Sequence, residues 1–193
     1  MLDHHLFRIG PREVEEMRRR CSDPAFLADY EAWARDCAPL VDGVIQQLKD
    51  AFAEVELGDG TGLWEAQGLD DDKVGEELSE LRARDETLDW RKIPVEHLER
   101  CYAAPWFMNA RGFVFHLPAF LIAELNDQHG YGFIDHVCRA EELPAGWSNV
   151  LTFAQRQALI AALRLAGKHP ECERERSAID QKIQQLALQQ RKG

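Results

Sequence analysis

The residue with the clearest capacity for chemistry is His116, which lies in the apolar run GFVFHLPAFLIAEL. A histidine titrates near neutral pH and acts as a general acid or base when a carboxylate lies beside it. Asp59 and Asp89 are the candidate carboxylates, with Glu65 and Glu124 as alternatives. Such a group would suit a small hydrolase-like enzyme. A core histidine bonded to a backbone carbonyl is nevertheless the commoner outcome, and no nucleophile motif such as G-x-S-x-G is present.

Two histidine and cysteine pairs have the side-chain types of a zinc site. His97 and Cys101 stand four residues apart, on one face of a helix, and His136 and Cys138 share one side if 135–138 forms a strand. Two histidines and two cysteines can hold zinc in a tetrahedron. The tight C-x₂₋₄-C spacing of structural zinc sites is missing, so half-buried side chains are favoured and no metal or other cofactor is expected. The spacing leaves open whether the four converge.

The loop LGDGTGL brings three glycines close together, as phosphate-binding loops do. It lacks the Lys-Ser/Thr of a P-loop and the G-x-G-x-x-G of a dinucleotide site, and Asp59 would repel a phosphate. We therefore interpret it as a turn in which glycines adopt positive φ and Asp59 caps the next helix.

Acidic residues are concentrated in one region. Residues 50–100 hold sixteen Asp and Glu against six Lys and Arg, a balance of −10 within a net charge of −11. An acidic field repels phosphate backbones, so nucleic-acid binding is disfavoured. The acids also lack EF-hand spacing, which favours a solvated face over a cation site. We expect an acidic surface that binds a basic protein, formed by Glu65, Asp70, Asp71, Asp72, Glu76 and Glu77.

Size and composition indicate one compact domain. The chain has 193 residues, of which 45% are hydrophobic and 30% charged, as in ordinary globular proteins. Its longest apolar run, residues 113–123, is interrupted by His116 and Pro118 and is shorter than the ~20 residues of a membrane span. The start MLDHHLFRIG does not resemble an export signal, and five scattered cysteines suggest reduced thiols. We expect a cytoplasmic protein that does not enter membranes.

Hydrophobic periodicity predicts a mainly α fold, a compact multi-helix domain. Helices are expected over 11–20, from Pro24 to Pro39 and over 41–55, and Thr152 with Gln155 forms a capping box at the start of another. The aromatic stretch 101–125 should form the core on which they pack. A small two-stranded β element near 113–116 and 133–138 is also expected, because aromatic and β-branched residues cluster there.

Three parts are expected along the chain. Residues 1–39 form an N-terminal helical extension, 40–169 the core domain and 170–193 a C-terminal helix. The last helix has one narrow apolar seam, Ile179, Ile183 and Leu186. This seam either docks on the body or pairs with a second copy to form a homo-oligomer, and the spacing does not decide between them.

Three segments in order, GDGTGLWEAQGLDD, DWRKIPVEHLERCY and GFVFHLPAFLIAEL, followed by LTFAQRQAL, resemble the bacterial domain-of-unknown-function family 6714 over about residues 40–166. The resemblance implies a small bacterial intracellular protein and supplies no catalytic residues. The favoured function is therefore a non-enzymatic interaction protein, an adaptor or immunity-type inhibitor, that uses its acidic face. The alternative is the His116 hydrolase.

Overall fold

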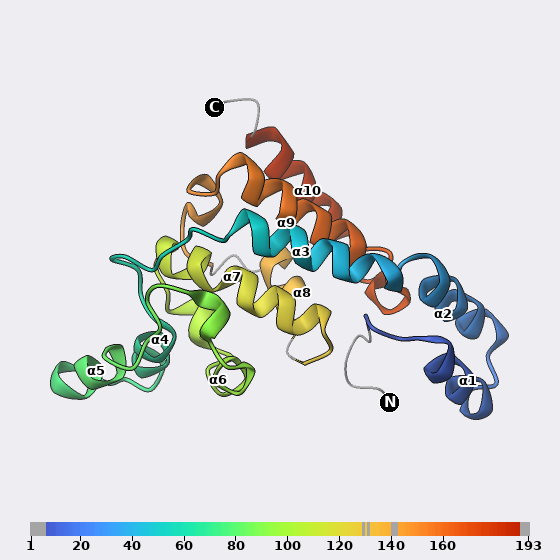
Figure 1. The fold of residues 1–193 in the computed structure, drawn as a ribbon, viewed down its shortest axis with the longest axis horizontal. Helices are drawn as coiled ribbons and strands as arrows, with labels where there is room; N and C mark the ends of the chain where they lie inside the picture. The colour runs from blue at the N-terminus through green and yellow to red at the C-terminus, as the bar shows by residue number, and fades with distance from the viewer. Residues whose placement is uncertain (1–6, 129, 131, 140–142, 190–193) are drawn as a thin grey trace.

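The computed structural model describes residues 7–128, 130, 132–139 and 143–189, and in these residues the fold is helical with no β-strand (Figure 1). The α-helices are α1 (Pro11–Arg20), α2 (Pro24–Asp36), α3 (Val41–Ala51), α4 (Leu63–Asp70), α5 (Gly75–Arg82), α6 (Val95–Arg100), α7 (Ala110–Leu125), α8 (Phe133–Arg139), α9 (Phe153–Ala166) and α10 (Arg176–Gln189). Short 3₁₀ turns join them at η1 (Ala38–Leu40), η2 (Trp90–Lys92), η3 (Ala104–Trp106), η4 (Trp147–Asn149) and η5 (Pro170–Glu173).

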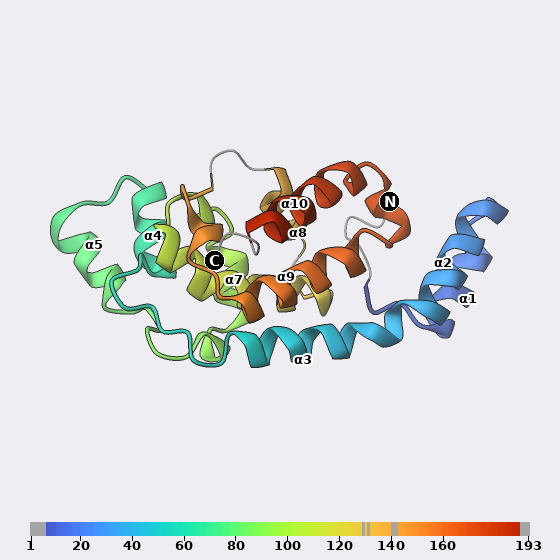
Figure 2. The ribbon, with the colours of Figure 1, turned by 90° about the horizontal axis from the view of Figure 1, so that it is seen from above.

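The body of the molecule is formed by α3, α7, α8, α9 and α10. Helix α3 packs against α9 and α7, and α10 covers α9 and α8 (Figures 1 and 2). On α3 the side chains Val44, Ile45 and Leu48 are buried, at the i, i+1, i+4 spacing of one helical face. The stretch expected to form the core is central, since α7 is buried along nearly its whole length.

The predicted β element is wrong. Residues 113–116 lie inside α7, which begins where the Asn109 side chain accepts a hydrogen bond from the Gly112 amide at 2.8 Å. Residues 133–138 lie in α8, where the Ile134 amide donates to the buried Glu124 carboxylate at 2.8 Å. Aromatic and β-branched residues cluster in α7 because neighbours surround the helix on all sides, so that tertiary burial overrides the local strand preference.

The N-terminal segment is attached to the body by buried aromatic contacts. Trp33 on α2 packs against Phe7 and against His169, with ring centroids 6.0 and 4.7 Å apart. The Tyr30 hydroxyl donates to Glu171 on η5. The division into extension, core and C-terminal helix stays a prediction, and its ends, residues 1–6 and 190–193, lie outside the described residues.

Local start signals are confirmed for α2 and α9. Asp23 accepts from the Ala25 and Phe26 amides ahead of Pro24. At α9 the Thr152 amide donates to the Gln155 side chain at 2.8 Å, and the Gln155 amide donates to the Thr152 hydroxyl at 3.2 Å. Both are the capping patterns expected from the sequence.

The apolar seam of α10 faces the body. Ile179 and Leu186 are buried, and Ile183 packs against the core. The seam therefore already contacts α8 and α9 within one chain. Pairing of two copies through this helix stays a prediction, and it would have to use the exposed side of α10.

Two further properties of the described residues concern membrane spans and cysteine thiols. None of these helices is long and apolar enough to cross a membrane. The five cysteines are free thiols, and burial raises the pKa of Cys101, Cys138 and Cys172 to about 12, which keeps them protonated at neutral pH.

Candidate functional site

Helices α4 and α5, residues 63–82, form a unit that we call the acidic arm. The arm lies at one end of the long axis of the molecule, opposite α1 and α2 (Figures 1 and 2). It contains seven Asp and Glu and two Lys and Arg, a net charge of 2 − 7 = −5. Helix α4 packs against η3 and α5, whereas α5 has no buried residue. The arm thus presents charge on an element that contributes little to the core.

The acidic side chains of the arm divide into neutralised and free groups. Lys73 pairs with Glu77 at 3.3 Å. The Gln67 amide donates to Asp70 at 3.2 Å and to Asp71 at 3.1 Å. Within the described part of the chain, no ion pair neutralises the exposed carboxylates of Asp70, Asp71, Asp72, Glu76 and Glu80. They form an unneutralised acidic surface.

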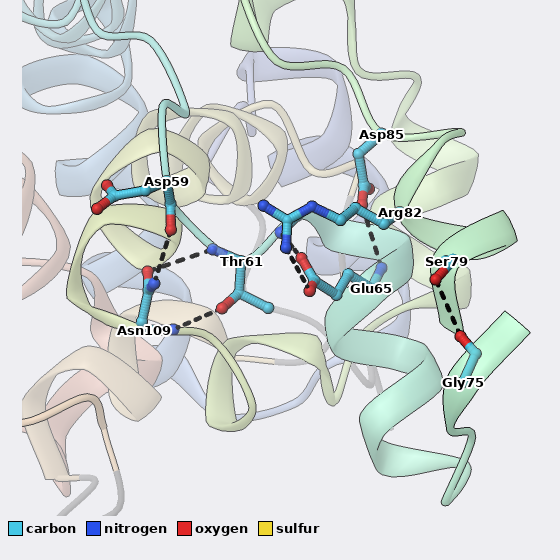
Figure 3. Close-up of polar contacts among 9 residues, drawn as sticks. Asp59, Thr61, Glu65, Gly75, Ser79, Arg82, Asp85 and Asn109 are labelled. Carbon is cyan, nitrogen blue, oxygen red and sulfur yellow. Dashed lines mark hydrogen bonds and ion pairs between the residues drawn. The ribbon is translucent and has the colours of Figure 1, made fainter. Parts of the chain in front are cut away.

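Glu65 has a different role from the other predicted partner-binding residues. Its carboxylate pairs with Arg82 of α5 at 2.9 Å and accepts from the Gly62 amide at 3.3 Å, and its side chain is 13% exposed (Figure 3). The Arg82 ion pair links α5 to the start of α4. Of the six predicted residues, the structure therefore places Asp70, Asp71, Asp72, Glu76 and Glu77 on the surface and Glu65 inside the arm.

Asp85 holds the arm to the rest of the molecule. Its carboxylate accepts from the Trp64 amide at 2.7 Å and from the Glu65 amide at 3.2 Å, so it caps α4 from outside the helix (Figure 3). A Cβ at Gly62 would lie 2.0 Å from this carboxylate, which explains the glycine. Burial raises the pKa of Asp85 to about 6, although both amide hydrogen bonds oppose that rise.

The glycine loop before α4 is a packing element. Asn109 donates from its side chain to the Asp59 carbonyl at 3.2 Å and accepts from the Thr61 amide at 3.2 Å (Figure 3). A Cβ at Gly112 would lie 2.2 Å from the Thr61 carbonyl oxygen, so the loop and α7 approach each other closely. The predicted capping role of Asp59 is wrong, since its carboxylate pairs with Arg111 at 2.9 Å and Asp85 supplies the cap.

A pocket of about 300 Å³ lies beside the cap of α4. It is bounded by residues from α4, the segment around η2, α6 and α7. Its apolar lining consists of Leu63, Trp64, Ile93 and Pro94, and its polar lining consists of Arg84, Asp85, Glu86, Lys92, His97 and His116. The pocket thus combines an apolar wall with titratable groups.

His116 belongs to the lining of this pocket and is 1% exposed. Its Nδ1 lies 2.7 Å from the Gly112 carbonyl oxygen, the backbone contact anticipated from the sequence. Burial lowers the pKa of the imidazole to about 4, so the ring is neutral at physiological pH.

The carboxylates proposed as partners of His116 lie outside the pocket lining. Asp59 pairs with Arg111, and Asp89 accepts from Arg91 Nε at 2.6 Å. Glu124 accepts from the Ile134 amide. Asp85 and Glu86 are the carboxylates that share the pocket with His116. Sequence reasoning missed Asp85 because its partners lie twenty residues away and carry no motif.

The histidine and cysteine pairs take separate structural positions. His97 packs edge-on against Trp64 at 5.0 Å, while His136 packs against Trp106 at 4.0 Å. Among the described residues, no group of three His, Cys, Asp or Glu side chains is arranged to hold a metal ion.

These observations define a mainly helical protein with a buried central helix, an acidic arm and an adjoining pocket. Residues 41–188 match the family of unknown function DUF6714, which is most of the chain, and the chain belongs to this family. The match begins at α3 and continues past the predicted boundary near residue 166 through most of α10. No curated protein and no solved structure matches the chain.

Proposed function

We propose that this protein is a non-enzymatic binding protein, of adaptor or immunity type, whose acidic arm docks a basic protein. The observation that supports it most directly is the exposed, unneutralised set of carboxylates on α4 and α5. A surface of one sign accelerates association with a partner of the opposite sign and makes binding depend on salt.

Aromatic side chains beside the arm support a protein partner in particular. Helix α4 packs on η3, and around η3 the side chains of Tyr102, Trp106 and Phe107 are 37 to 50% exposed. Exposed aromatics are frequent anchors in interfaces, and they attract Arg and Lys through cation–π contacts.

The experiment compares two triple variants of equal net charge. The arm variant is Asp71→Asn, Glu76→Gln and Glu80→Gln. The control variant, Glu16→Gln, Asp29→Asn and Asp180→Asn, removes three exposed acids from α1, α2 and α10. Each changes the net charge from −11 to −8. Wild type and both variants are immobilised, exposed to a cell lysate, and eluted with increasing salt.

The proposal expects a basic protein that wild type and the control variant retain at low salt, that the arm variant loses, and that elutes as screening increases. With the purified partner, the arm variant should show a reduced association rate and a shallower salt dependence. Equal retention by the two variants, whether full or reduced relative to wild type, would show that the acids of the arm have no special role, and would overturn the proposal.

The hydrolase alternative has weaker support in the geometry. Asp59 and Asp89 are engaged in ion pairs outside the pocket, and a ring whose pKa lies near 4 is a weak base at neutral pH. A neutral, buried imidazole is better suited to accept a hydrogen bond than to transfer a proton.

A further inference from the structure

The tautomer of His116 follows from its contact with the main chain. The Gly112 carbonyl oxygen can only accept a hydrogen bond, so Nδ1 at 2.7 Å must carry the proton. In the neutral ring Nε2 then has a free lone pair. Among the described residues it has no hydrogen-bond partner, although His116 is 1% exposed. A buried acceptor without a donor is unusual in a folded protein, and here the ring forms part of the lining of a cavity.

The walls around His116 favour an uncharged ligand with an apolar body. Leu63, Ile93 and Pro94 give the cavity its apolar side. In the lining, Arg84 and Lys92 supply two cations and Asp85 and Glu86 supply two carboxylates, and the neutral ring of His116 adds no charge. Burying a charged ligand here would carry a desolvation penalty without a net counter-charge.

The polar groups of the pocket are largely held in place by the protein itself. Asp85 accepts from the Trp64 and Glu65 amides, and Glu86 accepts from the Leu88 and Asp89 amides at 2.9 and 3.1 Å. The guanidinium of Arg84 lies 4.1 Å from the centre of the Trp64 ring. Among the described residues that line the pocket, His116 Nε2 is the buried side-chain polar atom without a hydrogen-bond partner, so a donor placed there would displace no existing contact.

We propose that this pocket binds a small uncharged molecule with an aromatic or similarly compact apolar body, whose O–H or N–H donates a hydrogen bond to His116 Nε2. Its volume of about 300 Å³ is at the lower end of ligand sites in proteins. A metal ion is a poor occupant, because the described residues provide no group of three ligands.

The test uses phenol as the probe and anisole, its methyl ether, as the matched control. Both have the same ring, but anisole has no O–H to donate. Binding to the full chain is followed by NMR, with the ¹⁵N resonance of His116 Nε2 as the direct reporter. We expect phenol to shift this resonance and to bind at least about tenfold more tightly than anisole, the factor that one hydrogen bond to a buried acceptor supplies.

Two variants make the test specific. His116→Phe keeps a ring of similar size and removes the acceptor, so phenol and anisole should bind with equal affinity. Should that variant fail to fold, Ile93→Trp puts a larger side chain at another lining position without changing His116, and both probes should lose affinity. The arm variant with three neutralised acids should bind phenol as wild type does, since none of the three substituted residues lines the pocket.

The proposal is overturned if neither probe binds at millimolar concentration, if the two bind wild type equally, or if phenol binds while the Nε2 resonance stays unchanged. The last two outcomes would identify an apolar cavity in which His116 has no recognition role.

Discussion

The body and helix α5 of the acidic arm differ in how deeply their side chains are buried. In the body, α7 is buried along nearly its whole length and holds α3, α8 and α6 around it through apolar contacts. In the arm, α5 has no buried residue, and it is held on α4 by the partly buried Leu78 and Leu81, which lie over Gly68, and by the ion pair of Glu65 with Arg82. Apolar burial is worth roughly 1.5–3 kcal/mol per large side chain, while an exposed ion pair contributes under ~1 kcal/mol. The body supplies stability, and the arm supplies a surface.

The two regions meet where the packing is closest. Gly60 and Gly112 allow the loop before α4 to touch α7, and Asp85 fixes the first turn of α4. The pocket with His116 lies at this boundary, between α4 on one side and α7 on the other. A ligand in this pocket would contact both regions at once.

The largest effect should come from a cavity in the body. Leu163 on α9 is fully buried, so Leu163→Ala is expected to lower the free energy of unfolding by about 2–5 kcal/mol. Leu69→Ala, at an exposed position on α4, is the control and should lower the free energy of unfolding by under ~1 kcal/mol. Urea denaturation followed by circular dichroism measures both. Equal losses would contradict the division between body and arm.

The next effect is the pH dependence that His116 gives to the body. The unfolded histidine takes up a proton near pH 6.5, whereas burial keeps the native ring neutral down to about pH 4. The stability that His116 adds is therefore complete above pH 6.5 and decreases as the pH falls toward 4. Over this range the free energy of unfolding should drop by about 3 kcal/mol.

The His116→Gln variant isolates this contribution, because its amide can still donate to Gly112 and does not titrate. Asp85 acts in the opposite direction, since its native pKa of about 6 exceeds the unfolded value of 3.8 and adds stability as pH falls. Subtracting the free energy of unfolding of the variant from that of wild type at each pH cancels the contribution of Asp85, which both proteins share. A difference that stays constant from pH 7 to pH 4 would show that the native ring can be protonated.

Much of the body could be predicted from the sequence, because its helix starts are local signals. Asp23 with Pro24 and Thr152 with Gln155 act within three residues of the backbone groups that they satisfy. The strand predicted for residues 113–116 is wrong for a reason that is not local. Their aromatic and β-branched side chains are large and apolar, and such side chains are also found in a helix that neighbouring elements bury on most sides.

The sequence predicts the negative charge of the arm but not how the arm is held in place. The concentration of acids is visible in the sequence, but the cap that holds α4 comes from Asp85, which no spacing rule connects to residues twenty positions earlier. The pocket was missed for the same reason, because its walls come from α4, α6 and α7. His116 itself was singled out correctly as unusual, and its Nδ1 contact with Gly112 is the common outcome expected for a core histidine.

A smaller effect should follow from loosening the arm at its cap. Asp85→Ala removes the acceptor of the Trp64 and Glu65 amides and should cost about 1–2 kcal/mol, as for other helix caps. Because the cap serves only α4, the loss should be local. Hydrogen exchange should accelerate at Trp64 and Glu65 and remain unchanged in α9. Uniform acceleration across both regions would show that arm and body unfold as one unit.

The smallest effects, and the sharpest in sign, should come from two acids on α5. Glu76 lies in the first turn of α5, where a negative charge is favoured by the helix dipole, while Glu80 lies near its C-terminal end, where the same charge is disfavoured. Glu76→Gln should therefore destabilise and Glu80→Gln should stabilise, each by a few tenths of a kcal/mol. Thermal denaturation at low and high salt tests this, since screening should bring both differences toward zero.

If α5 were buried against the body, both substitutions would change stability by more than a few tenths of a kcal/mol and salt would leave the changes intact. Opposite signs that vanish with salt are expected only of a solvated helix, whose acids are then available to a partner.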